Sequence, residues 1–476
     1  MKNKLFILLC FLGIGLCSCN DWLDVKPQTE VEVGKMFERQ QGFQDALTGA
    51  YLDMKSSNAY GEDMTYGSIE YLAQHWTYST GDRGEAISRY NYINSYAQGV
   101  FETMYSKLYT IIADVNEILE NIDAHQDVFE KNMYGMIKGE ALAIRAYCHF
   151  DLLRLFGPMP SNVQSGVILP YVKTVSIQNH EHHTYTQYVD LLEEDLTAAD
   201  SLLKVSDPIC EFEILTDTLN ITAATKDFMR KRQVRFNYYA VKALEARFYL
   251  WLGDEASKTK AYSCAMEVIG ALDKDEKNIF ELGTSKSISN MDFAFSSEHI
   301  MAIYDYELYT NANEAFRESV SYSKPREIVM ADLYPAGTTD IRFTGLWTEV
   351  TTANQTRMHV IKKYWQKDES NGINQIPLLR LSEMYFIAME CGSLDMANQL
   401  YDAFCIARNI PSVNIQSAEQ LKTILIEEYN KEFYAEGQTF YAYKRLAVED
   451  ILWASDPGDE EAYVVPLPSS EINYGK

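Results

Sequence analysis

The sequence predicts a mainly α-helical protein in which pairs of helices carry long loops and a few short strands. Three observations predict this class. Apolar residues recur with helical spacing over much of the chain, Gly-containing turns divide the helices into consecutive pairs, and two long Tyr-rich segments interrupt the pattern. We expect about four irregular, tetratricopeptide-like pairs forming a curved scaffold, with the binding surface on the loops and strands.

The first 18 residues have the pattern of a bacterial lipoprotein signal peptide. Lys2 and Lys4 precede an apolar run, residues 5–16, which has the length of a signal-peptide core and is too short to span a membrane. The run ends in Leu-Cys-Ser-Cys, a lipobox whose second cysteine is Cys19. We therefore predict removal of residues 1–18 and a lipid anchor on Cys19 that holds several acyl chains. The alternative is an ordinary secretory signal with an incidental cysteine.

After the anchor we expect a tether over residues 19–40 and a single domain over residues 41–476. Its N-terminal part covers about 41–210 and its C-terminal part about 280–476. The formal net charge of −26 argues against binding to nucleic acid or to anionic lipid, since both need a basic face. The five cysteines beyond Cys19 have no metal-binding spacing and are odd in number, which disfavours a disulfide framework or a zinc site.

The helical pattern can be divided into separate elements. Predicted helices cover 101–122, 129–156, 188–203, 236–252, 258–269, 377–391, 396–408 and 418–436. Gly157-Pro158 ends the second of them and Gly253-Asp254 ends the fourth. Short strands are expected at 299–304 and 358–363.

Two arginines stand among apolar positions of the predicted helices. Arg145 and Arg380 must be paired if they are buried, because an unpaired buried charge is costly. Glu140 and Glu383 are the nearest candidate partners in the sequence, and we interpret these four residues as structural.

A series of motifs in a fixed order then indicates a family. The motifs are Trp22–Pro27, Phe43 to Tyr51, Tyr109 with Ile112 and Asn116, Gly139–Ala146, Phe156–Pro160, Ala243–Asp254, Pro377–Glu390, Glu432–Arg445 and Pro466–Asn473. Their order over most of the chain resembles the SusD/RagB family of nutrient-binding outer-membrane lipoproteins. The chain departs from the family pattern at Tyr105, where a Trp is usual, and at Tyr429, where an Arg is common.

The resemblance implies a lipoprotein of a Bacteroidetes-type outer membrane that faces the cell exterior. Such a protein captures an oligosaccharide, or in some cases a peptide, and acts as the lid of a SusC-like TonB-dependent transporter. It would touch the membrane through its lipid alone. No catalysis, cofactor or metal is implied.

The resemblance also indicates where the ligand binds. Part of the family's site comes from loops before the helix that carries Asn116, and the rest comes from the irregular second half. These regions coincide with the Tyr-rich segments 56–98 and 271–360. The candidate ligand-binding residues are Trp76, Tyr78, Asp82, Arg83, Tyr90, Tyr306, Tyr309 and Trp347. The rings would stack on sugars and the charged groups would bind hydroxyls, although core packing is the alternative for each ring. Trp365 is left out as core.

Three other functions remain as alternatives. The same architecture could bind peptides, or it could be a repeat scaffold that binds only another protein. A surface glycoside hydrolase would need two carboxylates at a defined separation, but 68 acidic residues make such pairs uninformative. No G-x-S-x-G, H-E-x-x-H or P-loop pattern occurs. His180, His182 and His183 cluster without a further ligand nearby, so no metal site is predicted.

Overall fold

A computed structural model describes residues 35–176, 178–210, 222–334, 338–352, 354–365 and 373–474. The predicted signal peptide, the predicted lipidation site at Cys19 and most of the predicted tether lie outside these residues. In the part of the chain that is described, no helix has the length and apolar character that crossing a bilayer would demand.

Helices form most of the structure. The longer ones are α3 (Gln40–Met54), α6 (Ser95–Ile122), α7 (Met133–Phe156), α8 (Tyr185–Ser206), α10 (Tyr238–Leu252), α11 (Glu255–Ile269), α16 (Leu381–Cys391), α17 (Leu394–Arg408), α18 (Ala418–Glu432) and α19 (Thr439–Leu446). The shorter ones include α4 (Ile69–Leu72), α5 (Arg83–Ser88), α9 (Ala223–Phe228), α13 (Leu308–Asn313), α14 (Arg326–Ile328), α15 (Ile341–Leu346), α20 (Glu460–Tyr463) and α21 (Ser469–Tyr474).

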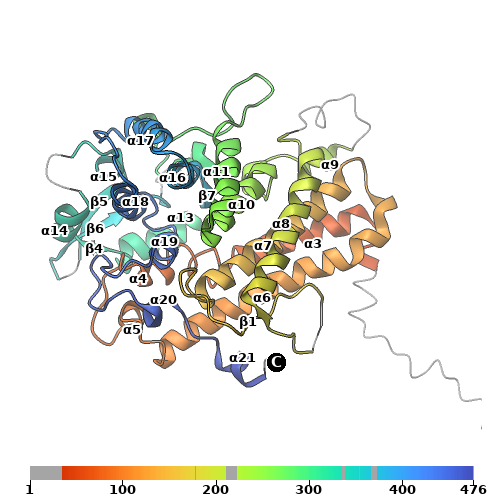
Figure 1. Ribbon diagram of the computed structural model, residues 1–476, viewed down its shortest axis with the longest axis horizontal. Helices are drawn as coiled ribbons and strands as arrows, with labels where there is room; N and C mark the ends of the chain where they lie inside the picture. Colours follow the sequence, from red (N-terminus) through yellow and green to blue (C-terminus); the bar gives the residue numbers. More distant parts are fainter. Residues whose placement is uncertain are drawn as a thin grey trace, which may run out of the picture.

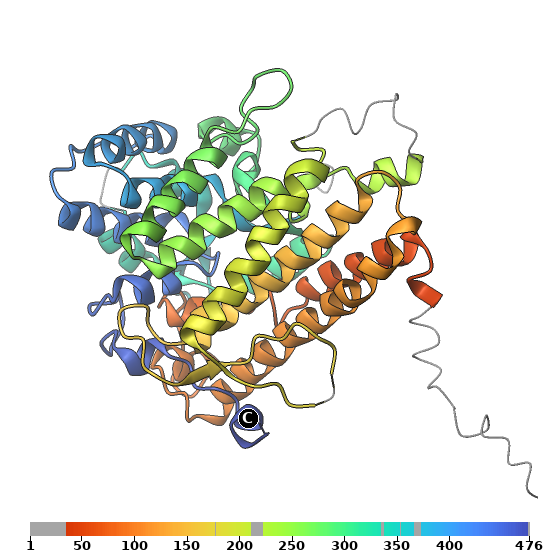
Figure 2. The same ribbon diagram turned by 45° about the vertical axis from the view of Figure 1, so that its right-hand side comes forward.

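The long helices are arranged as packed neighbours. In the N-terminal half α3, α6, α7 and α8 lie side by side, each against the next, as Figure 2 shows. The hairpins α10–α11 and α16–α17 pack on each other beside them, and α18–α19 follows (Figure 1). This arrangement confirms the predicted helix-pair scaffold.

Local sequence explains where two of the helices meet. Gly253 has a φ of 75° and ends α10 in a left-handed conformation that glycine adopts without strain. Asp254 then caps α11, because its carboxylate accepts hydrogen bonds from the backbone N–H groups of Ala256 and Ser257. The two residues together make the tight turn of the α10–α11 hairpin.

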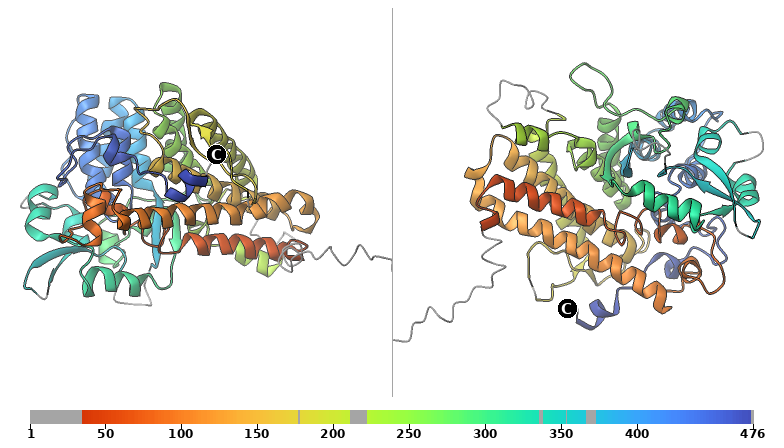
Figure 3. Two further views of the ribbon diagram at one scale, coloured as in Figure 1. Left: turned by 90° about the horizontal axis from the view of Figure 1, so that it is seen from below. Right: turned by 180° about the vertical axis from the view of Figure 1, so that it is seen from behind.

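Short strands make small antiparallel sheets. β3 (His299–Tyr304) pairs with β7 (Gln375–Arg380), β1 (Val167–Leu169) pairs with β2 (His183–Thr184), and β4 (Lys324–Pro325), β6 (Arg357–Ile361) and β5 (Trp347–Thr351) form a three-stranded sheet in that order. Figure 3 shows this three-stranded sheet at the end of the molecule away from α3.

The predicted helix over residues 377–391 begins too early. The apolar run that begins at Pro377 was expected to be helical, but the structure has the strand β7 up to Arg380 and the helix only from Leu381. A short apolar run has no decisive periodicity, and here hydrogen bonding to β3 decides the conformation. The last predicted helix also stops early, at Glu432, because the chain turns toward Gly437, whose φ is 73°.

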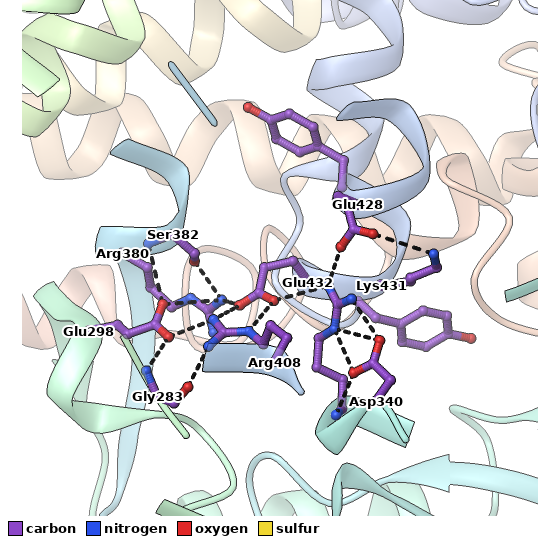
Figure 4. Close-up of polar contacts among 12 residues, drawn as sticks. Gly283, Glu298, Asp340, Arg380, Ser382, Arg408, Glu428, Lys431 and Glu432 are labelled. Carbon is purple, nitrogen blue, oxygen red and sulfur yellow. Dashed lines mark hydrogen bonds and ion pairs between the residues drawn. The ribbon is translucent and has the colours of Figure 1, made fainter. Parts of the chain in front are cut away.

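A cluster of buried charges joins the C-terminal helices to the β3–β7 sheet (Figure 4). Arg408 of α17 donates to Glu298 at 2.6 Å and to Glu432 of α18 at 2.9 Å. Arg380, at the end of β7, also donates to Glu432. Burial alone would raise the pKa of Glu432, but the guanidinium groups of Arg408 and Arg380 hold it well below its usual range. The carboxylate therefore stays ionised in the core and ties three elements together.

The partners expected for the two sequence-predicted arginines are wrong. Arg380 donates to Glu432. Glu383 instead accepts two hydrogen bonds from Arg247, each 2.6 Å long. Likewise Glu140 receives a hydrogen bond from Arg232 at 2.6 Å and leaves Arg145 to another partner. In each case the prediction of a buried and paired charge is confirmed, and only the choice of partner is wrong.

Candidate binding site

A cavity of about 680 Å³ opens between the loop that leads into α5 and the segment after α13. Its lining residues are Glu62, Tyr71, Thr77, Tyr78, Ser79, Asp82, Arg83, Gly84, Asn311, Glu314, Ala315, Ser319, Val320, Ser321, Tyr322, Ser323, Thr352 and Met358. The two walls come from parts of the chain that are more than 200 residues apart. In Figure 1 α4 and α5 lie beside the β4–β6–β5 sheet, at the lower left of the molecule.

Two hydrogen bonds to backbone carbonyls hold the two walls together. The N–H of Thr77 donates to the carbonyl of Ser323 at 2.9 Å. One residue further along, the ammonium of Lys324 donates to the carbonyl of Gln74 at 2.6 Å. Burial lowers the pKa of Lys324 to about 8, since the buried ammonium has little solvent around it. The position of the first loop therefore depends on the second segment.

Tyr322 forms part of the cavity wall and rests on Trp76. Their ring centroids are 5.4 Å apart and the rings are nearly parallel, at 26°. The hydroxyl of Tyr322 donates to Glu62 at 2.6 Å, and the indole N–H of Trp76 donates to the carbonyl of Tyr66 at 3.0 Å. The stack fixes both the plane and the polar edge of Tyr322.

The structure buries both tryptophans that were predicted to stack on a ligand. Trp76 is 1% exposed because Tyr322, Phe316 and Tyr434 surround its indole. Trp347 is 6% exposed and packs against Tyr434, with 4.7 Å between ring centroids. Neither indole offers a face to a ligand. Trp76 instead supports a ring that lines the cavity.

Asp82, Arg83 and Gly84 form the rim at the start of α5. The carboxylate of Asp82 caps the helix by accepting from the N–H of Glu85 at 3.0 Å, and it also accepts from the N–H of Ser79. Gly84 lies flat against Tyr71, so close that a Cβ there would stand 2.2 Å from the ring carbon Cε1. Only glycine allows the start of α5 to approach the Tyr71 ring this closely.

Arg83 extends along the rim and is about half exposed. Its guanidinium lies 3.5 Å from the carboxylate of Asp63 and 3.3 Å from the hydroxyl of Ser68. The centroid of the Tyr96 ring lies 5.8 Å from the same guanidinium group. Burial of Asp63 raises the pKa of that carboxyl, while Ser68 and Arg83 act in the opposite direction.

The structure brings only three of the predicted site residues to the cavity, namely Tyr78, Asp82 and Arg83. The hydroxyl of Tyr90 donates to the carbonyl of Leu72 at 3.2 Å, and the ring does not line the cavity. Tyr306 is 67% exposed with the Lys55 ammonium 4.5 Å from its ring centroid. Tyr306 and Tyr309 do not line the cavity either, and their roles stay predictions.

Several lining residues were missed from the sequence. Asn311, Glu314 and Tyr322 are the main ones, with Glu62 on the opposite wall. One sequence pattern could have indicated this wall. In residues 319–323, Ser-Val-Ser-Tyr-Ser, hydroxyl side chains flank an aromatic ring. The run lies in irregular backbone and has no periodicity, so only the fold shows that it faces the first loop.

The groups around this cavity suit a ligand rich in hydroxyl groups. Carboxylate, amide and hydroxyl side chains alternate with three tyrosine rings, and these are the groups that bind sugar hydroxyls and C–H faces. A second cavity of about 370 Å³ lies between α6 and residues 170–180, and no predicted site residue lines it.

The histidine cluster is occupied with structural contacts. The Nε2 atom of His182 lies 2.6 Å from a carboxylate oxygen of Glu471, and the Nδ1 atom of His183 accepts from the N–H of Tyr171 at 3.1 Å. Across the residues that the structure describes, no three His, Cys, Asp or Glu side chains are grouped so that they could hold a metal ion.

A SusD-like family, described as starch-binding and associating with the outer membrane, matches residues 21–250 of this chain. SusD-like protein P2 of Formosa agariphila is 21% identical over 99% of this chain and 97% of its own length. SusD-like protein P25 of the same organism is 23% identical, over 34% of this chain and 31% of its own length.

Solved structures share the fold. A SusD superfamily protein of Bacteroides thetaiotaomicron matches with a TM-score of 0.66 and 21% identity, over 91% of this chain and 98% of that one. A SusD-like carbohydrate binding protein of Bacteroides vulgatus matches with a TM-score of 0.68 and 15% identity, over 92% and 96% of the two chains.

Proposed function

We propose that this chain, which belongs to the SusD/RagB family, binds a glycan at the cell surface and acts as the lid of a SusC-like TonB-dependent transporter. The family model is described as starch-binding and associating with the outer membrane, and one structural neighbour is described as carbohydrate binding. The protein would capture the ligand and pass it to the barrel without breaking a bond.

The cavity between the α5 loop and residues 311–323 is the observation that carries this proposal. It is large enough for a few sugar rings, since ligand sites typically have volumes of roughly 300–1,000 Å³. Tyr78 supplies a half-buried ring, while Asn311 and Glu314 supply polar groups on the opposite wall. We assign sugar contact to these residues together with Arg83.

A panel of soluble glycans tests this assignment. It contains oligosaccharides of starch, pectic galactan, xylan, mannan, oligogalacturonate and chondroitin sulfate, with basic and neutral peptides as a second arm. Tyr78→Ala should weaken binding of the glycan that binds best by about three- to tenfold, the usual value of an aromatic contact. Tyr304→Ala is the control, because Tyr304 is 55% exposed and lies outside the cavity. Binding of peptides alone would contradict glycan capture.

The position at the cell surface rests on the N-terminal segment. We propose that residues 1–18 are removed, that Cys19 carries the lipid, and that residues 19–40 tether the domain. A Cys19→Ala protein should leave the outer-membrane fraction, and pull-down of the lipidated protein should recover a TonB-dependent barrel. Membrane retention of Cys19→Ala would remove the anchor, and the absence of any barrel would remove the lid.

A further inference from the structure

The charged side chains around the cavity do not balance. Glu62, Asp82, Glu314 and Arg83 are the charged residues that line it. Among the residues described, the three carboxylates take part in no ion pair within 4.0 Å, whereas Arg83 faces the carboxylate of Asp63 at 3.5 Å. The single cation thus has its ion-pair partner outside the cavity, and the three carboxylates of the lining outnumber it.

The carboxylates are close enough to influence one another. Burial raises the pKa of Glu62, and the charges of Asp63 and Glu314 raise it further, against the effects of Tyr322 and Arg83. Glu62 and Glu314 come from the two opposite walls, so negative charge faces a ligand from both sides.

An adjoining cavity of about 380 Å³ does not reverse this sign. It shares Asp82 and Arg83 with the first cavity and adds Glu85 and Arg89. These two added residues pair with each other at 3.4 Å, so their charges cancel. The rest of its lining, which includes Tyr96, is uncharged, so a ligand that crosses the Asp82–Arg83 rim meets no basic patch.

We propose that this site selects uncharged glycans and rejects glycans that carry carboxylate or sulfate groups. The inference rests on the proposed glycan binding and narrows its substrate class. A neutral hydroxyl can donate a charge-assisted hydrogen bond to a carboxylate of the cavity wall. A carboxylate or sulfate group at the same place is repelled by the carboxylates of the wall. At physiological salt this repulsion still acts over about 8 Å.

Matched pairs of probes test the selection. The glycan that binds best in the panel is converted into its charge partner: primary hydroxyls of a neutral glycan are oxidised to carboxylates, or carboxylates of an anionic glycan are reduced to alcohols. The neutral member should bind at least about tenfold more tightly. Binding of the anionic member should strengthen as salt rises from low to physiological concentration, because salt screens the repulsion.

A pair of variants assigns the selection to the cavity. Glu314→Gln should reduce the ratio between the affinities for the neutral and the anionic member by about three- to tenfold, mainly because the anionic member binds more tightly. Glu318→Gln makes the same change in net charge four residues further on, outside the cavity, and should leave the preference unchanged.

Each outcome separates the two proposals. Tighter binding of the anionic member, or equal effects of the two variants, would overturn the selection while glycan binding stands. If no glycan of the panel binds, or if only basic peptides bind, the proposed function itself fails and the selection fails with it.

Discussion

Arg145 and Asp195 form a buried, two-pronged ion pair between α7 and α8. The Nε and Nη2 atoms of Arg145 each donate to one carboxylate oxygen at 2.7 Å. The third guanidinium nitrogen donates to the side-chain carbonyl of Asn116 on α6 at 2.8 Å, and the Tyr171 hydroxyl donates to Asp195 at 2.6 Å. One arginine thereby joins three helices of the N-terminal half.

We expect Asp195→Asn to lower the free energy of unfolding by about 3–5 kcal/mol, because it leaves the Arg145 charge buried without its partner. Chemical denaturation measures the change. Glu194→Gln is the matched control, since the neighbouring carboxylate is 66% exposed and its pair with Lys173 is worth less than about 1 kcal/mol. Equal losses for the two variants would contradict the structural role of the pair.

Trp76→Ala and Tyr78→Ala should separate stability from binding. Trp76 is buried beneath Tyr322, so its removal should cost about 3–5 kcal/mol of folding free energy. Tyr78 is half-buried at the cavity wall, so its removal should weaken glycan binding and change the melting temperature little. Thermal melts and titrations on both variants decide this, and a stable Trp76→Ala protein would refute the supporting role of the indole.

Gly84→Ala should disturb the rim of the cavity. The added methyl would stand 2.2 Å from the Tyr71 ring, so ring and helix must move apart at a cost of about 1–3 kcal/mol. Glycan binding should weaken as well, because Arg83 moves with the backbone. Gly99→Ala in α6 is the control. Apart from its chain neighbours and the backbone of its own helix, no atom lies within 4 Å of the new methyl, and alanine should stabilise the helix by roughly 0.5–1 kcal/mol. A Gly84→Ala protein that keeps full stability would argue against the close approach.

Asp114 should make stability depend on pH. Burial and the neighbouring Asp53 carboxylate raise the pKa of Asp114 to about 7, against the effect of Lys107. In the unfolded chain the same group ionises near pH 4. Between about pH 4 and pH 7 the folded state therefore binds more protons, and this contribution to stability falls as pH rises.

Replacing this carboxyl tests the sign. Asp114→Asn should remove this pH-dependent loss of stability. The melting temperature of the variant should therefore rise relative to that of the wild type as pH rises from about 4.5 to 7.5. Asp190→Asn, at an exposed position of α8, should show no such gain. The opposite slope would mean that Asp114 is ionised in the fold at neutral pH.

The sequence predicted much of the scaffold because its signals are local. Helical spacing of apolar residues located α6, α7 and α10, and Gly253-Asp254 marked the turn after α10. The same reasoning could not choose ion-pair partners. Glu140 and Arg145 are five positions apart, which turns their side chains to different sides of a helix. Arg145 therefore meets Asp195, and Glu140 meets Arg232.

For the site, the sequence determined the first Tyr-rich loop and the presence of Tyr78, Asp82 and Arg83, because aromatic and charged residues in a Gly-flanked turn are a local pattern. Only the tertiary structure decided which rings line the cavity. Trp76 is buried because Tyr322, far from it in the sequence, packs on its ring. Glu314 lines the cavity from the opposite wall, which is more than 200 residues from the loop in the sequence. Exposure of a side chain depends on what packs over it, and that is a property of the whole fold.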